Sequence, residues 1–241
     1  MIISTTEIQN NFGKYLKLAE YEDVLITRNG KKAARLSAFK EDEYDDQLML
    51  RETSPEYAAS HVKVTYEEYL KITEESEHRY ELIDGEIYFL ASPFYPHQKA
   101  VKEILTEFVI WFRDKKCEPL AAPFDVTLFK SEKNICVVQP DILVMCDRDK
   151  IDKKGRYTGV PSLVVEVLSE STSSKDNVIK LNLYMSTGVK EYWIVNTESK
   201  EIYIYVFNGK GIKHLFSFNE NKRAESSYFS GLGVDLQRVF E

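Results

Sequence analysis

Two carboxylates interrupt apolar runs in the second half of the chain. Asp141 lies within VVQPDILVM and Glu166 within LVVEVL. Such runs are typical of strands covered on both faces of a sheet, where an ionised carboxylate is costly unless it is paired or bound to a cation. Because the two runs are expected to form neighbouring strands, we predict that they share a divalent cation. Ligands that are oxygen alone favour Mg²⁺ or Mn²⁺.

Further polar residues extend this group. Asp125 interrupts PFDVTLF and Glu81 interrupts YELI, and we predict that both join Asp141 and Glu166 as metal ligands. Lys180 lies on the helix expected after the Glu166 strand, where its ammonium could orient the attacking water or stabilise developing negative charge. The residue types therefore indicate a metal site that keeps water ligands for a substrate phosphate.

Each of these residues also has a structural interpretation. Asp141 could form a local hydrogen bond at a strand edge, and Glu166 could belong to a structural ion pair. Lys180 could pair with Asp176 one helical turn earlier, a contact worth only ~0.2–0.5 kcal/mol.

The elements that would position these side chains form a mixed α/β or α+β arrangement. Thr65 and Glu68 form a capping box that starts a helix, and Asp84-Gly85 marks a hairpin. Apolar residues at helical spacing predict a long amphipathic helix over 97–116. The expected order is then three strands, a helix over about 173–187 and further strands, which predicts a mixed sheet flanked by helices. The three strand-like runs are APFDVTLF, NICVVQPDILVM and PSLVVEVLS.

The first forty residues read as a separate small unit. Ser4 and Glu7 form a capping box at the start of an amphipathic helix, and Asn29-Gly30 joins two strands. A unit this small seldom stabilises itself by burial alone, so we expect it to dimerise or to pack on another part of the chain.

Charge divides the chain in the same way. Residues 1–40 carry a net charge of +3, residues 41–61 carry −6 and residues 62–241 carry −4 within a total of −7. This distribution predicts a basic domain over 1–40, an acidic linker over 41–61 and a larger domain over 62–241.

Composition indicates a cytoplasmic protein. No apolar stretch approaches the ~18–20 residues needed to cross a bilayer, and the N-terminus lacks the features of a signal peptide. The cysteines are odd in number, and two lie in apolar runs, so we expect Cys117, Cys136 and Cys146 to be reduced core residues.

The larger domain resembles a known family. TYEEYL, YELIDGEIY, SPFYPHQKAV, QPDILVM, PSLVVEVLSEST, KDNVIK and GVKEYWIVN follow, in order, the blocks of restriction-endonuclease-like proteins of the PD-(D/E)xK superfamily. The resemblance implies a restriction-endonuclease-like αβββαβ core with extra β-hairpins, DNA cleavage, and Asp141 and Glu166 as metal ligands. It also implies roles for Lys180, Glu81 and His97, although His97 could instead begin its helix or pack on Tyr95. Leu168 stands where the superfamily pattern has lysine, and Lys180 would replace it.

Residues 1–39 resemble the N-terminal domain of Phd/YefM-type antitoxins. That resemblance implies dimerisation and operator binding, with a partner held by the acidic segment that follows. Lysines and arginines are expected to contact phosphates. The alternative is that they are solvated surface charges. The candidates are Lys14, Lys17, Arg28, Lys31 and Lys32, together with Lys150, Lys153, Lys154 and Arg156 of the larger domain.

The functional prediction is a metal-dependent DNA endonuclease that acts as a homodimer. Two alternatives remain. The chain could be a non-catalytic DNA-binding regulator, or a fused toxin–antitoxin pair in which the first domain restrains the nuclease.

Overall fold

The computed structural model describes residues 2–8, 12, 15, 19, 24–28, 31–36, 63–74, 76, 78–168, 175–219 and 222–241. The chain divides into two compact units, with the division near residue 51, and each is described by itself. The predicted acidic linker over 41–61 lies outside the described residues. The predicted domain boundaries therefore stay a prediction.

The first unit contains a short helix and a three-stranded sheet in the order β1-β2-β3. Residues 5–8 are helical, and the Glu7 amide donates to Ser4 Oγ at 3.1 Å, as a capping box requires. The predicted hairpin is formed by β2 and β3, and the chain start adds a parallel strand that the sequence analysis did not identify. The strands are β1 (Ile2–Ser4), β2 (Val24–Arg28) and β3 (Lys31–Leu36).

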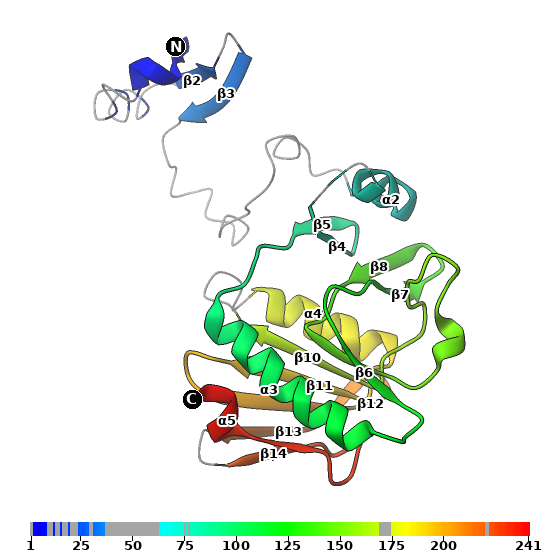
Figure 1. Cartoon of the computed structure of the whole chain (residues 1–241). Coiled ribbons are helices and arrows are strands. Elements are labelled where there is room, and N and C mark those ends of the chain that lie inside the picture. Colours follow the sequence, from blue (N-terminus) through cyan, green and yellow to red (C-terminus); the bar gives the residue numbers. More distant parts are fainter. Residues whose placement is uncertain are drawn as a thin grey trace. The chain divides into compact units, whose positions relative to one another are not determined.

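The second unit is built on a six-stranded sheet in the order β13-β12-β11-β10-β9-β6 (Figure 1). Only β10 and β11 pair in parallel, joined by a helix, and the other neighbours are antiparallel. The strands are β6 (Glu118–Ala121), β9 (Ile142–Met145), β10 (Leu163–Leu168), β11 (Glu191–Asn196), β12 (Glu201–Asn208) and β13 (Gly211–Asn219).

Helices cover both faces of this sheet. α3 (Tyr95–Phe112) buries Ile104 and Phe108 against one face, together with α5 (Leu236–Phe240). α4 (Lys175–Thr187) buries Leu183 against the other face. The order α3-β6-β9-β10-α4-β11 is the αβββαβ core that the sequence predicts, and the fold prediction is confirmed. A small hairpin, β14 (Arg223–Glu225) and β15 (Gly233–Asp235), precedes α5.

A four-stranded sheet in the order β5-β4-β8-β7 packs beside α4. Its hairpin turn at Asp84 and Gly85 has φ of 52° and 85°, the positive values that a two-residue turn requires. α2 (Tyr66–Glu74) lies on its outer face and begins with the predicted capping box, since the Thr65 amide donates to Glu68 Oε2 at 2.8 Å. The strands are β4 (Tyr80–Ile83), β5 (Glu86–Phe89), β7 (Val126–Ser131) and β8 (Asn134–Val138).

Two strand predictions were wrong in detail. The run NICVVQPDILVM is two strands, because β8 ends at Val138 and β9 begins at Ile142 in the other sheet. The first strand of the core is β6, which precedes the predicted run APFDVTLF and was not predicted from the sequence. Pro140 lacks an amide hydrogen and cannot continue a ladder, so the chain changes sheets across residues 139–141.

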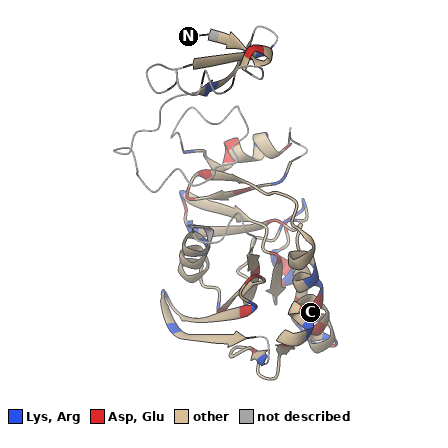
Figure 2. Ribbon diagram, turned by 90° about the vertical axis from the view of Figure 1, so that its left-hand side faces the viewer, with Lys and Arg blue, Asp and Glu red and all other residues tan. Residues whose placement is uncertain are grey.

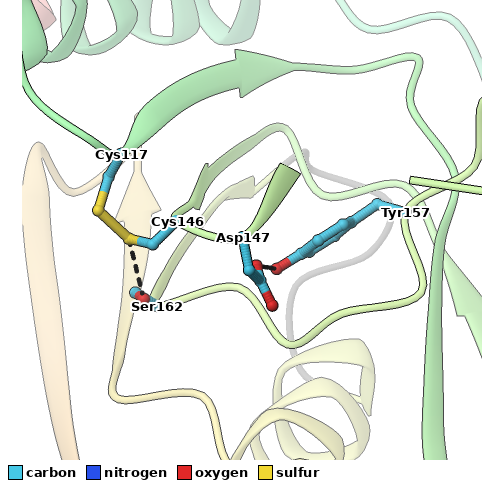
Figure 3. Close-up of a disulfide and its surroundings, with 5 residues drawn as sticks. All are labelled: Cys117, Cys146, Asp147, Tyr157 and Ser162. Carbon is cyan, nitrogen blue, oxygen red and sulfur yellow. Dashed lines mark hydrogen bonds between the residues drawn. A yellow bond between two sulfur atoms is a disulfide. The ribbon is translucent and has the colours of Figure 1, made fainter. Parts of the chain in front are cut away.

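The prediction of three reduced cysteines was wrong for two of them. Cys117 and Cys146 form a disulfide, whereas Cys136 is free and buried. Glu118 pairs with Met145 in the β6–β9 ladder, and continuing that register by one residue sets the two cysteines opposite each other. Figure 3 shows the bridge, with Cys146 Sγ 3.4 Å from Ser162 Oγ. The sequence pattern did not reveal β6, so this pairing could not be foreseen.

The disulfide also removes one support for a cytoplasmic location, because disulfides are rare in reducing compartments. No helix in the described part of the chain combines the length and apolar character needed to cross a membrane.

Candidate active site

Asp141 and Glu166 lie side by side because their strands are neighbours. β9 and β10 pair antiparallel with Ile142 opposite Val165, so the next residue pair is Asp141 and Glu166. Directly opposed residues project from the same face of a sheet. Asp141 also reaches across to β10, where its Oδ2 accepts from the Val167 amide at 2.8 Å. Their side chains are 19% and 11% exposed, which leaves both carboxylates within reach of a ligand.

Lys180 projects from α4 toward this pair. Its Nζ lies 3.0 Å from Glu166 Oε1 and 3.1 Å from Glu81 Oε1, and the side chain is only 12% exposed. The ammonium thus bridges a carboxylate of the four-stranded sheet and a carboxylate of the six-stranded sheet. The alternative was a pair between Lys180 and Asp176 on the same helix, but the side chain of Asp176 lies outside the described residues. The two contacts of Lys180 within the described residues are with Glu166 and Glu81, which are on other elements.

Glu81 is occupied by its neighbours rather than open to a cation. It is 2% exposed, its Oε1 accepts from the Gln139 amide at 2.8 Å, and Oε2 also lies 3.1 Å from Lys180. The Gln139 side chain continues this chain of contacts, since its Nε2 donates to Asp125 Oδ1 at 2.8 Å. Asp125 therefore lies beyond Gln139.

The structure does not bring the four predicted metal ligands together. Within the described ranges, no three His, Cys, Asp or Glu side chains gather as a group able to hold a metal ion. Asp141 and Glu166 adjoin each other, whereas Glu81 binds Lys180 and Asp125 binds Gln139. A metal site of four carboxylates is therefore not what this arrangement offers.

His97 completes the group from the N-terminal end of α3. Its Nε2 lies 3.2 Å from Asp141 Oδ2, so its ring is turned toward the carboxylate. Tyr95, the residue against which it could have packed, is 77% exposed. His97 Nδ1 is buried and has no hydrogen-bond partner among the described residues.

Burial dominates the ionisation of this site. It raises the pKa of Glu166 to about 7; Lys180 opposes this rise, and the negative charges of Asp141 and Glu81 add to it. Burial alone would lower the pKa of Lys180, but Glu166 and Glu81 outweigh it and hold that pKa well above the usual value. Lys180 is therefore protonated at neutral pH, while Glu166 can gain or lose its proton there.

The remaining carboxylate oxygens suit a hard divalent cation. Asp141 Oδ1 and Glu166 Oε2 have no hydrogen-bond partner in the described part of the second unit. Mg²⁺ is commonly held by one or two carboxylates and fills its other positions with water and substrate phosphate. The pair fits that requirement without a third protein carboxylate.

Two residues of the group were not found from the sequence. Tyr184 donates its hydroxyl to Glu166 Oε1 at 2.6 Å, and Gln139 joins Asp125 to Glu81. Tyr184 follows Lys180 by four positions and so shares its face of α4, a signal that could have identified it. The contacts of Gln139 could not be predicted in this way, because they depend on how the chain passes from β8 to β9 across residues 139–141.

The predicted nucleic-acid contacts of the second unit all lie in one tract, residues 150–156. Lys154 and Arg156 pair with Glu74 and Asp152, and the tract they belong to separates β9 from β10. Lysines and arginines of the second unit occur on several elements rather than on one (Figure 2). Lys150 and Lys153 are exposed in the same tract; Arg28 is exposed in the first unit; the side chains of Lys14, Lys17, Lys31 and Lys32 lie outside the described residues.

The second unit has a restriction-endonuclease-like fold. The family model Uma2, described as "Putative restriction endonuclease", matches residues 66–237, and the chain belongs to that family. Residues 1–51 match a second model, the Phd_YefM antitoxin of type II toxin–antitoxin systems.

The chain is also similar to another protein sequence and to a solved structure. An uncharacterized protein of Synechocystis is 30% identical over 165 residues, which cover 68% of this chain and 84% of that protein. A crystal structure from Anabaena variabilis, titled "a putative nuclease belonging to DUF820", superimposes with a TM-score of 0.59 at 19% identity. The match covers 73% of this chain and 97% of that one, and at this identity it shows the shared fold.

Proposed function

We propose that the second unit is a divalent-metal-dependent endodeoxyribonuclease, with Asp141 and Glu166 as the ligands of Mg²⁺ or Mn²⁺. The observation that carries this proposal is the convergence of these two carboxylates, each with one unengaged oxygen, beside a buried ammonium. The family's description, "Putative restriction endonuclease", supports DNA as the proposed substrate. Lys180 and His97 are the other catalytic residues.

The protein's own groups then have defined tasks. When bound, the cation would neutralise the scissile phosphate and make a coordinated water more acidic. Lys180 places a fixed positive charge where negative charge develops as water attacks phosphorus and the sugar oxygen leaves. Glu81 and Tyr184 orient this lysine and Glu166 through their hydrogen bonds. His97 holds Asp141 in position through Nε2 and offers Nδ1 as a buried polar group at the site.

The test is cleavage of supercoiled plasmid by the full chain with Mg²⁺ or Mn²⁺. We expect Asp141→Ala and Glu166→Ala each to abolish cleavage, whereas Glu225→Gln, which changes an exposed carboxylate of β14, keeps it. Single-stranded DNA and RNA are assayed in parallel. Cleavage that persists in both alanine variants after identical purification would exclude the proposed metal ligands.

A second candidate function is favoured by the antitoxin match of residues 1–51. The first unit would bind operator DNA, with Lys14, Lys31 and Lys32 among the phosphate contacts, and would restrain the nuclease. Removal of residues 1–60 should then raise cleavage activity. Unchanged activity would rule out restraint, and operator binding without cleavage in any divalent metal would favour a purely regulatory protein. A homodimer remains a prediction, tested by light scattering of the full chain.

A further inference from the structure

A cavity of about 300 Å³ lies between α2 and the outer face of the four-stranded sheet. Tyr69 and Leu70 line it from the helix, and Thr127 and Val137 line it from β7 and β8. Small-molecule sites in proteins begin at about this volume. The cavity is separate from the catalytic group, because Gln139 stands between Asp125 at its lining and Glu81 at the site.

Thr127 marks this cavity as a binding site. The residue is 2% exposed, and its hydroxyl has no hydrogen-bond partner in the described part of the chain. Its register partner is Val137, which packs with Tyr69 on the side facing α2. Buried hydroxyls without a partner are uncommon and costly. Thr73 offers a contrast in the same lining, since its hydroxyl is bonded to the Tyr69 carbonyl at 3.1 Å.

Charges of opposite sign line the cavity, and among the described residues Asp125 and Arg156 form no direct ion pair with each other. Gln139 occupies Asp125 Oδ1, and Oδ2 has no hydrogen-bond partner among the described residues. Arg156 uses Nε for Asp152 at 3.1 Å, which leaves its terminal amino groups without a partner in the same set. A ligand here must therefore present hydrogen-bond donors toward Asp125 and acceptors toward Arg156.

We propose that this cavity binds the guanine base of a nucleotide. Guanine carries two N–H donors beside the O6 acceptor on one edge, which matches a carboxylate and a guanidinium on the same lining. The Tyr69 ring, fixed by its hydroxyl bond to the Tyr80 carbonyl at 2.8 Å, supplies an aromatic wall for the base. Adenine and the pyrimidines do not present this order of donors and acceptor on that edge.

The mouth of the cavity suits the phosphate of such a nucleotide. Lys154 and Glu74 both line it and form an ion pair at 3.1 Å, with each side chain 64% exposed. Exposed pairs of this kind are weak, so a phosphate can displace Glu74 and take the lysine. The same chemistry is available from a free nucleotide or from a base of a nucleic-acid strand.

Calorimetry of the full chain without metal tests this inference, so the result does not depend on cleavage. GMP, AMP, CMP and UMP are each titrated into the protein and their affinities are compared. Glutamate is titrated in the same way, because its ammonium and carboxylate could bind Asp125 and Arg156. We expect GMP to bind more tightly than every other compound. Equal binding of all four nucleotides, no binding of GMP at millimolar concentration, or tighter binding of glutamate would overturn the assignment.

Two matched variants identify the site. Thr127→Val removes the unpartnered hydroxyl and should weaken GMP about tenfold, the equivalent of one hydrogen bond. Its ligand-free melting temperature should not fall, because no internal hydrogen bond is lost. Thr73→Val should leave GMP affinity unchanged. Equal effects of the two variants on affinity would show that GMP binds elsewhere.

A competition experiment distinguishes a free nucleotide from a base of a nucleic-acid strand as the source of the guanine. Displacement of GMP by a guanine-containing oligonucleotide, but not by one that lacks guanine, identifies a strand as the donor of the base. GMP that binds selectively and resists both oligonucleotides identifies a free nucleotide. Displacement by both oligonucleotides alike would contradict guanine recognition.

Discussion

The substitution Lys180→Met tests how much the ammonium between Glu81 and Glu166 contributes to the free energy of unfolding. Methionine keeps much of the side-chain length but removes the ammonium from between Glu81 and Glu166, which are both buried. Breaking a buried ion pair from one side costs about 3–5 kcal/mol, a large part of the ~5–15 kcal/mol that stabilises a typical domain. We expect a loss of that size in the free energy of unfolding at pH 8.

The loss should shrink in acid. Burial raises the pKa of Glu166 and Lys180 opposes that rise, so without the lysine the folded pKa of Glu166 lies further above that of the unfolded chain. The folded variant then binds more protons than the unfolded chain, and its stability falls as pH rises from about 5 to 8. The slope is at most ~1.4 kcal/mol per pH unit for each retained proton.

Urea unfolding of the full chain at pH 5 and pH 8 measures both effects. Lys102→Met is the matched control, because Lys102 pairs with Glu103 at 2.7 Å but is 68% exposed. An exposed pair contributes about 0–1 kcal/mol. If Lys180→Met costs no more than this control at pH 8, or costs the same at both pH values, the ammonium is not the buried bridge described above.

Four further results are expected. Because the pKa of Glu166 is about 7, Mn²⁺ affinity measured by calorimetry should rise between pH 6 and 8, and a flat profile would contradict a proton competing at this carboxylate. Glu81→Gln should lower plasmid cleavage at least about tenfold through the misplaced lysine while leaving Mn²⁺ affinity nearly unchanged; loss of Mn²⁺ binding would restore Glu81 as a ligand. Asp125→Ala should also spare Mn²⁺ affinity, and a large decrease would return Asp125 to the metal site. Cys117→Ser should cost about 3 kcal/mol in unfolding free energy under oxidising conditions, and a matching loss in wild type with reductant would show that the disulfide to Cys146 is responsible.

The sequence predicts the centre of this molecule well because its signals there are local. Apolar runs identify β9 and β10, and the carboxylates that interrupt them are the ones that adjoin in the structure. Capping residues locate the start of α2, and helical periodicity locates α3 to within a few residues at each end. The order of these elements predicts a mixed sheet flanked by helices, but β6, the first strand of the core, is not among them.

What the sequence could not predict depends on pairing between distant segments. The change of sheet at Pro140, the separate strand β6 and the Cys117–Cys146 bridge all follow from which strands become neighbours. The role of Asp125 depends on the same step, since Gln139 reaches it only because the chain turns there. A carboxylate within an apolar run shows that a partner is needed and does not show which partner it is.

The division of the site between two sheets makes its geometry sensitive to their mutual tilt. Glu81 is carried by the smaller sheet and Glu166 by the larger one, and Lys180 stands on a helix that packs against both. One buried cluster joins the two sheets and α4, so a rotation between the sheets would change the ammonium contacts together with the packing of that cluster. A partner or ligand that moves the two sheets apart would therefore separate Lys180 from Glu81 or Glu166 without contacting the lysine itself.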